Sequence, residues 1–300
     1  MKNTRSLTKK RSRYTIKAGN HQLRLGDKTH IMGVLNLTND SFSQDGCLNK
    51  ANSVDHAIRK AKNFIRNGAS IIDVGGESSR PGATQISVKE EVRRIIPTIS
   101  AVSKFQQSIV SVDTYKSTVA KHALDAGAII VNNIMGSTPN VSLLKMVRNY
   151  NAAIVLMHIK GIPRTMQTNI KYKSVVSDII DTLQKSINVC LDSGISKDRI
   201  IIDPGIGFGK TVGHNLTLLN QLTKFNELKT PILIGTSRKS FIGKVLNKEP
   251  QKSLLGTMAT VTSSILKGAH IVRVHDVKET KEVVDMTDAI INETEKGTNT

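Results

Sequence analysis

Eight short segments rich in β-branched residues recur along the chain, and this repetition constrains its fold more than any other feature. They are IMGVLNL (31–37), ASIIDVG (69–75), SIVSVD (108–113), AIIVNNI (128–134), AAIVLMH (152–158), RIIIDPG (199–205), PILIGTS (231–237) and AHIVRVH (269–275). Each segment is nearly continuously apolar, which is typical of strands that are covered on both faces. The repetition therefore predicts eight buried parallel strands.

Helical patterns, with apolar residues three and four positions apart, lie between these strands and predict helices over 54–68, 117–127, 176–194 and 255–268. These helices end at Gly68, Gly127, Gly194 and Gly268, where a C-cap favours a left-handed residue. Eight strand–helix units in about 265 residues match a single-domain (β/α)8 TIM barrel. The alternative is a doubly wound sheet, which has fewer strands and a G-x-G-x-x-G turn after the first one. Here GVLNLTND follows the start of the first strand.

The composition argues against several classes of protein. No apolar stretch approaches the roughly 18 residues of a membrane span, so we expect no membrane partner. The basic N-terminus lacks the apolar segment of a secretory signal. Cys47 and Cys190 form no C-x-x-C pair, which argues against a zinc site or a disulfide framework. We expect a cytoplasmic enzyme.

The net charge of +19 is distributed unevenly along the chain. Residues 1–26 carry eight Lys or Arg and no acidic residue, whereas later basic residues are scattered and often adjoin acids. We predict a basic, disordered tail over 1–20 and a barrel over 21–295. The aromatic residues on which single-strand binders stack bases are scarce, so we expect no nucleic-acid partner. A nucleic-acid-binding protein remains the alternative from a different class, and it predicts salt-sensitive RNA binding.

The segment DPGIGFGKT (203–211) resembles a phosphate-binding P-loop. That motif requires G-x-x-x-x-G-K-[ST], and its first glycine would stand at 204, where the chain has Pro204. The segment alone is compatible with an altered nucleotide loop, an unrelated turn or a different binding site.

Polar residues stand at the end of every predicted strand, where TIM barrels carry their catalytic groups. They are Asn36, Asp73, Asp113, Asn132, Asn133, His158, Asp203, Arg238, Lys239, Arg273, His275 and Asp276. The cations of the last two strands favour phosphate, and an oxygen of Asn36 with phosphate oxygens would suit Mg²⁺. Asp113, Asn132 and Asp203 would suit a flat heterocycle bearing N–H groups. In the alternative interpretation, the aspartates form internal ion pairs with Lys239 and Arg273.

Eight motifs together resemble the dihydropteroate synthase family from about residue 22 to 292. They are MGVLNLTNDSFS, IIDVGGESSRPGA, SVDTYKSTVA, GAIIVNNI, LMH, DPGIGFGK, GTSRKSFIG and IVRVHDV. The resemblance implies a TIM barrel that joins 4-aminobenzoate to 6-hydroxymethyl-7,8-dihydropterin diphosphate and releases diphosphate. It also implies Mg²⁺, a homodimer and inhibition by sulfonamides.

The resemblance further implies a role for each motif residue. Asp113, Asn132, Asp203 and Lys239 would bind the pterin, and Asn36, Arg273 and His275 the diphosphate, with Asn36 also holding the metal. Ser79, Arg80, Pro81, Phe208, Lys210 and Ser240 would bind 4-aminobenzoate. Asp113, Asp203, Lys239 and Arg273 would be catalytic. His158 is expected to be structural, because an aniline attacks without a general base.

The chain departs from the family pattern at three positions. Asn39 replaces a proline in the first loop, Asn133 replaces an aspartate, and Ser79 replaces a threonine. We expect the first change to affect loop closure and the second to remove a negative charge beside the pterin. Corrinoid-dependent methyltransferases, which share a pterin-binding barrel, are the rival enzyme class, but they are not expected to combine SRKS with GGESSRP.

Overall fold

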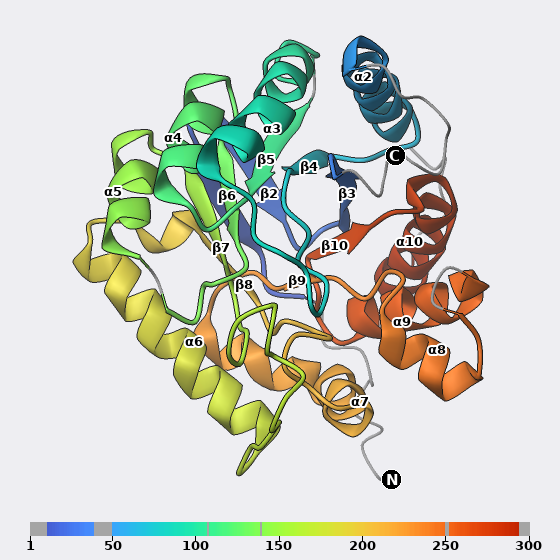
Figure 1. Cartoon of the computed structure of the whole chain (residues 1–300). Helices are drawn as coiled ribbons and strands as arrows, with labels where there is room; N and C mark the ends of the chain where they lie inside the picture. Colours follow the sequence, from blue (N-terminus) through green and yellow to red (C-terminus); the bar gives the residue numbers. More distant parts are fainter. Residues whose placement is uncertain (1–10, 39–49, 107, 139, 250–251, 294–300) are drawn as a thin grey trace, which may run out of the picture.

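Eight parallel strands close into a barrel in the computed structural model, which describes residues 11–38, 50–106, 108–138, 140–249 and 252–293 (Figure 1). The strands run in the order β8-β7-β6-β5-β4-β3-β10-β9, and a bridge between Ile202 and Ile232 joins the two ends. This arrangement confirms the predicted single-domain TIM barrel. The strands are β3 (His30–Asn36), β4 (Ile71–Gly75), β5 (Ile109–Asp113), β6 (Ile130–Asn133), β7 (Ala153–Met157), β8 (Ile200–Asp203), β9 (Leu233–Ile234) and β10 (Ile271–Val274).

Helices surround the barrel and follow the strands in sequence (Figure 1). They are α2 (Lys50–Arg66), α3 (Val88–Val102), α4 (Ser117–Asp125), α5 (Val141–Asn149), α6 (Val175–Asp192), α7 (Val212–Asn220), α8 (Ser240–Leu246), α9 (Leu254–Leu266) and α10 (Val277–Asn292). Two 3-10 helices, η1 (Lys197–Arg199) and η2 (Leu222–Leu228), precede β8 and β9. The four predicted helices are confirmed. Gly68 and Gly127 have φ values of 92° and 105°, as left-handed helix ends require.

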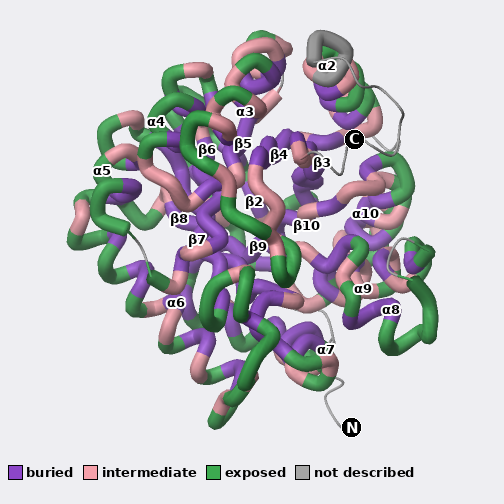
Figure 2. The backbone as a smooth tube through the Cα atoms, viewed as in Figure 1, coloured by how far each residue is buried: buried purple, intermediate pink, exposed green. Residues whose placement is uncertain are grey.

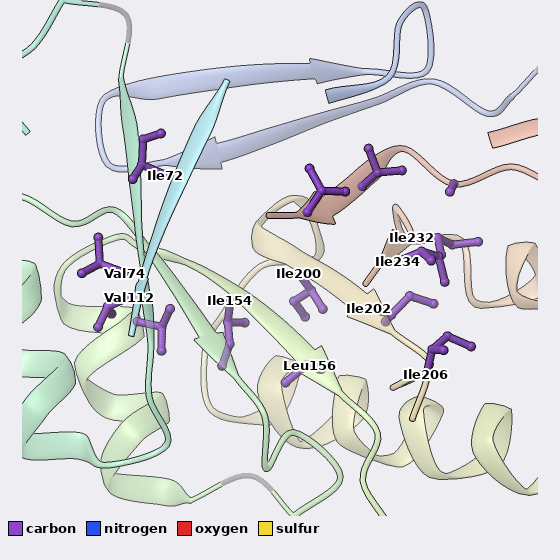
Figure 3. Packing of buried hydrophobic residues seen from close by; sticks show 14 of the residues in the cluster. Ile72, Val74, Val112, Ile154, Leu156, Ile200, Ile202, Ile206, Ile232 and Ile234 are labelled. Atoms are coloured by element: carbon purple, nitrogen blue, oxygen red, sulfur yellow. The ribbon is translucent and has the colours of Figure 1, made fainter. Parts of the chain in front are cut away.

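Side chains alternate between the two faces of each strand, which divides the apolar core into two parts. Outward-facing residues such as Ile72, Ile154 and Ile202 pack with the helices (Figure 3). Inward-facing residues such as Ile71, Ile130 and Ile201 form a separate cluster inside the barrel. Figure 2 shows the resulting distribution, with buried residues along the strands and exposed ones at the periphery.

An N-terminal hairpin covers the end of the barrel where the strands begin. It consists of β1 (Tyr14–Ala18) and β2 (His21–Leu25), paired antiparallel. Its buried residues Ile16, Ala18, Leu23 and Leu25 belong to the same cluster as the inward-facing strand residues. The hairpin therefore completes the core of the barrel.

The hairpin corrects the prediction that residues 1–20 form a disordered tail. Arg11 is 9% exposed and donates to Asp288 of α10 at 2.6 Å, and Asp288 also accepts from the Thr29 amide. The prediction was wrong over 11–20 because it rested on basic charge alone. It took no account of the alternating apolar residues Ile16 and Ala18, which the hairpin buries. Residues 1–10 lie outside the described residues. Within the described ranges, no helix is both long and apolar enough to cross a membrane.

Candidate active site

The polar residues predicted at the strand ends share one position in the fold. Asp73, Asn132, Asp203 and Arg273 each stand two residues after an inward-facing isoleucine of the interior cluster, on β4, β6, β8 and β10 respectively. Because strand side chains alternate, residues two apart face the same side. The polar residues therefore lie next to the apolar cluster inside the barrel, on its carboxyl-end side. TIM-barrel enzymes have their active sites at this end of the barrel.

Arg273 forms ion pairs with two aspartates from neighbouring strands. Its Nε donates to Asp73 Oδ2 and its Nη2 donates to Asp113 Oδ2, both at 2.7 Å. Asn132 Nδ2 also donates to Asp73 Oδ2 at 2.9 Å. Burial lowers the pKa of Arg273, but Asp73 and Asp113 outweigh it, so the net shift is upward. The internal ion pairs considered from the sequence are thus confirmed for Arg273.

Asp73 was not assigned to the site from the sequence, although it was noted at a strand end. Its side chain is fully buried, and Oδ1 has no hydrogen-bond partner among the described residues. Its position in the strand could have identified it. Asp73 stands two residues after Ile71, just as Asp203 stands two residues after Ile201, so both aspartates face the same side as an interior isoleucine. Asp73 supports both Arg273 and Asn132.

Asp203 ends β8 and is 5% exposed. Oδ1 accepts from the Gly205 amide at 2.7 Å. Burial raises the pKa of Asp203 to about 6, opposed by the Gly205 bond and by the charges of Lys239, Lys210 and Arg273. Burial similarly raises the pKa of Asp113 to about 7, and Arg273 opposes that shift. Both carboxylates would gain from donors that a ligand supplies.

Lys239 stands at the N-cap of α8 and lies close to Gly207, in the turn that follows Asp203. Its Nζ is 3.9 Å from the centre of the Phe208 ring, which is a cation–π contact. Burial and the nearby Arg273 charge lower the pKa of Lys239 to about 8, against the attraction of Asp203 and Asp113. The charges of Asp203 and Asp113 thus act on Lys239, although neither carboxylate forms an ion pair with it among the described contacts.

Asn36 ends β3 and stands in register with Gly75, Asp113 and Asn132 across four neighbouring strands. A Cβ at Gly75 would lie 3.6 Å from Asn36 Oδ1 and 3.6 Å from Asp113 Oδ2. The absence of a side chain at Gly75 thus leaves space between two oxygen-bearing groups. Asn39 and most of the first loop lie outside the described residues.

His275 contacts Ser237, which lies in the segment between β9 and α8. Its Nδ1 is 3.0 Å from Ser237 Oγ, which also accepts from the His275 amide at 3.2 Å. Burial, followed by Arg273, Arg238 and Lys239, lowers the pKa of His275 well below its ordinary value. The lowered pKa favours the neutral imidazole in the free protein. Because Nδ1 lies against the serine, Nε2 is the ring nitrogen left to meet a ligand.

The segment 203–211 forms a tight turn rather than a P-loop. Gly205, Gly207 and Gly209 all have positive φ, and a Cβ at Gly205 would lie 1.8 Å from the His158 carbonyl oxygen. Tyr172 donates to the Gly209 carbonyl at 2.9 Å, and Gln167 Nε2 donates to the Gly207 carbonyl at 2.9 Å. The β7–α6 segment thus fixes the turn that presents Phe208.

Lys210, which the family resemblance assigns to 4-aminobenzoate, has its Nζ bonded within the protein beneath the 203–211 turn. Lys210 is 3% exposed, and Nζ donates to the Phe208 carbonyl at 2.9 Å and lies 3.1 Å from His158 Nδ1. The glycine-bent turn directs the side chain underneath the loop. Burial lowers the pKa of His158 to about 2, with the Lys210 charge contributing, so His158 is a neutral acceptor. This contact agrees with the structural role expected for His158.

Asn133 does not lie beside the site, although we expected the loss of a charge there. Its Oδ1 accepts from the Met135 amide at 3.0 Å in the turn after β6. Adjacent strand residues face opposite sides, so Asn133 faces away from Asn132. The substitution therefore changes a turn rather than the charge of the site.

The second loop and the start of α8 border the site. Ser79 and Asp113 line one pocket, together with Tyr115 and Ile134. Arg80, Pro81 and Ser240 are exposed. Of the predicted 4-aminobenzoate residues, Ser79 is therefore adjacent to the pterin residues, whereas Arg80, Pro81 and Ser240 are at the rim. Among the described residues, no three His, Cys, Asp or Glu side chains gather as a metal site would require.

Comparison with known proteins agrees with this geometry. The family model described as "Pterin binding enzyme" matches residues 32–275. The chain is 44% identical to the dihydropteroate synthase of Clostridium beijerinckii over 92% of its own length and 99% of that protein.

Solved structures show the same likeness in three dimensions. A Clostridium difficile dihydropteroate synthase in the presence of pteroic acid has a TM-score of 0.82 and 42% identity, covering 89% of this chain and 98% of that one. A Xanthomonas albilineans dihydropteroate synthase with 4-aminobenzoic acid has a TM-score of 0.85 and 34% identity, covering 93% and 98%.

Proposed function

The chain belongs to the pterin-binding enzyme family, and from this premise we infer that it acts as a dihydropteroate synthase in folate biosynthesis. It is a transferase that condenses 6-hydroxymethyl-7,8-dihydropterin diphosphate with 4-aminobenzoate. One observation carries this inference: Asp113, Asn132 and Asp203 stand at the carboxyl ends of β5, β6 and β8. Lys239 and Arg273 lie at the same end of the barrel.

We propose that the pterin ring binds among these residues. Asp203 accepts one bond from the Gly205 amide, which leaves lone pairs for two N–H donors of the ring. Asn132 is held by its bond to Asp73, so its orientation is set before the ligand arrives. Lys239, held above Phe208, supplies a donor to the ring from the opposite side.

We propose that the diphosphate lies toward Asn36, Arg273 and His275. His275 would present Nε2 to the diphosphate, because Ser237 lies against Nδ1. Arg273 still has N–H groups beyond the two bonded to Asp73 and Asp113. These donors stabilise the charge that develops on the leaving oxygen.

The oxygen donors beside Gly75 suit Mg²⁺, which takes one or two protein oxygens and completes its shell with water and phosphate oxygens. Asn36 would hold it. When bound, the ion would neutralise charge on the departing diphosphate. This assignment is a proposal that the chemistry of Asn36 and its neighbour Asp113 supports.

We propose that 4-aminobenzoate binds between the second loop and the turn that presents Phe208. Ser79, Arg80, Pro81 and Ser240 would surround it, and Lys210 would support the turn from beneath.

In the reaction, the bond between the pterin methylene carbon and the diphosphate oxygen breaks, and the oxygen keeps the electron pair. The amino nitrogen forms the new bond to the methylene carbon and then releases one proton to solvent. Asp113 and Asp203 stabilise the positive charge that develops on the pterin.

A diphosphate-release assay with both substrates and Mg²⁺ tests the function. We expect release that depends on 4-aminobenzoate. Binding of the pterin diphosphate without turnover would instead indicate a pterin-binding relative such as a methyltransferase.

We also propose a homodimer and a cytoplasmic location. The packed helices α9 and α10 expose Leu255, Met286 and Ile290 by 81%, 63% and 57%, and such apolar residues suit an interface with a second copy. The buried free thiol of Cys190 is compatible with a reducing compartment.

A further inference from the structure

A partly buried charge cluster lies beside the site and has no role in the function proposed above. It consists of Lys116, at the N-cap of α4, with Glu77, Glu91 and Tyr115. Lys116 Nζ donates to Glu77 Oε2 at 2.6 Å, to Glu91 Oε2 at 2.8 Å and to the Ile86 carbonyl at 2.7 Å. These three bonds use all three N–H groups of the ammonium.

The cluster joins the two ends of the second loop. Glu77 stands at the start of the loop and Ile86 near its end, and Lys116 bonds to both. The Ile86 amide also donates to Glu77 Oε2 at 2.9 Å, and the Tyr115 hydroxyl donates to Oε1 at 2.8 Å. The loop is thereby closed at its base and attached to the segment that follows β5.

Between these ends, the hydrogen bonds within the loop join residues that are only two or three positions apart in the sequence. The Arg80 amide is 3.4 Å from Ser78 Oγ, and the Ala83 amide donates to the Arg80 carbonyl at 3.1 Å. Arg80 and Pro81 are exposed. Such local bonds do not place a loop relative to the barrel. Among the described bonds, the position of Ser79–Pro81 rests on those at the base of the loop, namely the cluster and the bond from Arg94 Nη1 to the Gly76 carbonyl at 3.1 Å.

The cluster is also part of the wall of the site. Glu77, Glu91 and Tyr115 line the same pocket as Ser79 and Asp113. Glu91 is 1% exposed, and the Lys116 side chain is 15% exposed, so their ion pair is shielded from solvent. A shielded pair holds its geometry more strongly than a surface pair does.

We propose that Lys116 is a positioning residue for the 4-aminobenzoate side of the site, acting through Glu77 to hold the second loop against the pocket. This inference rests on the proposed function for the identity of the substrate. The pterin residues Asp113, Asn132 and Asp203 belong to the barrel strands, whereas Ser79–Pro81 belong to the loop, so we expect loss of the anchor to affect the 4-aminobenzoate side more than the pterin side.

The test compares Lys116→Met with Lys116→Arg, which keeps a cation, and with the milder Tyr115→Phe, which removes one bond to Glu77. Lys121→Met is the matched control, because Lys121 lies on the same helix in an exposed pair with Asp125. Steady-state kinetics with both substrates, titration of the pterin diphosphate with Mg²⁺, and hydrogen exchange of the amides between 78 and 86 are measured for each.

We expect Lys116→Met to raise KM for 4-aminobenzoate by about tenfold or more, with Kd for the pterin diphosphate changed by less than about twofold. Tyr115→Phe should shift the same KM by about threefold, and Lys116→Arg should recover part of the loss. Amides between 78 and 86 should exchange faster in Lys116→Met, and Lys121→Met should resemble the parent.

Two results would overturn the inference: unchanged KM with unchanged exchange, or equal weakening of both substrates. If Lys116→Met does not fold, Tyr115→Phe decides the question by the same two criteria. If the parent shows no turnover, the proposed function fails. Exchange over 78–86 still decides the anchoring, because it is measured without substrates.

Discussion

Arg273 Nη2 donates to Asp113 Oδ2 at 2.7 Å, although 160 residues separate the two in the sequence. The bond connects the eighth strand of the barrel to the third, and Arg273 also bonds to Asp73 on the second strand. The free protein therefore holds its arginine between carboxylates before any anion is present. A diphosphate would share this arginine rather than meet an unpaired cation.

Replacing Arg273 by lysine should separate its two roles. Lysine keeps the charge but cannot bond to both aspartates and an anion with a planar fork. We expect calorimetry to show a loss of about 2 kcal/mol in binding the pterin diphosphate and a smaller loss for free hydroxymethylpterin. Equal losses would contradict the role as an anion clamp. Arg273→Ala is less informative, because an unpaired buried Asp73 costs about 3–5 kcal/mol of stability.

Asp203→Asn should nearly abolish pterin binding. The amide replaces one acceptor oxygen by a donor that meets the ring N–H groups, so we expect Kd to rise by about 100-fold or more. Asp198→Asn is the matched control, since Asp198 pairs with Lys17 at the opposite end of the barrel. Fluorescence titration with the pterin measures both variants.

Activity should fall in mild acid. The pKa values of Asp113 and Asp203 are raised to about 7 and about 6, and both carboxylates must be ionised to accept from the ring. We therefore expect kcat/KM to rise with pH through the pKa values of both carboxylates and to reach its plateau only above about pH 8. A profile that is flat between about pH 5 and pH 7 would contradict the assigned roles of these aspartates.

Stability should fall in acid for a separate reason at the other end of the barrel. His270 is fully buried, bonding to the Ser12 carbonyl and the Ile232 amide, and burial lowers its pKa to about 4. Between about pH 6.5 and pH 4 the unfolded chain binds a proton that the folded chain does not, so the free energy of unfolding decreases as pH falls.

The contribution of His270 is on the order of 3 kcal/mol at most. Urea unfolding at several pH values measures it, and His270→Gln should lose less stability over this window than the parent. An identical pH slope for the two proteins would show that His270 does not determine acid stability.

Leu255→Asp should dissociate the proposed homodimer. A charge at a residue that is 81% exposed costs little in a monomer but is unfavourable inside an apolar interface. Light scattering should give half the parent mass. Val141→Asp on α5, at a residue 74% exposed, should leave the mass unchanged. A parent that is already monomeric would refute the dimer.

The strand residues could be predicted because their pattern is local. Asp113, Asn132 and Asp203 each end a short apolar run, and a parallel barrel brings all such ends to one face. The alternation within one strand also separates Asn132 from Asn133, and this consequence of the pattern was missed. The hairpin was not predicted because its apolar alternation is short, with Ile16 and Ala18 lying among basic residues.

The number of strands and the barrel follow from recurring apolar runs separated by helical patterns of period about 3.6. The same runs place Asp113, Asn132 and Asp203 at strand ends, and the family motifs associate those ends with a pterin. The direction of Lys210, the lowered pKa of His275 and the cluster around Lys116 depend on turns and on partners far away in the chain. Each requires a glycine-bent loop or a desolvated contact that forms when the strands close. No local pattern encodes such a contact, because its free energy comes from neighbours that folding alone brings together.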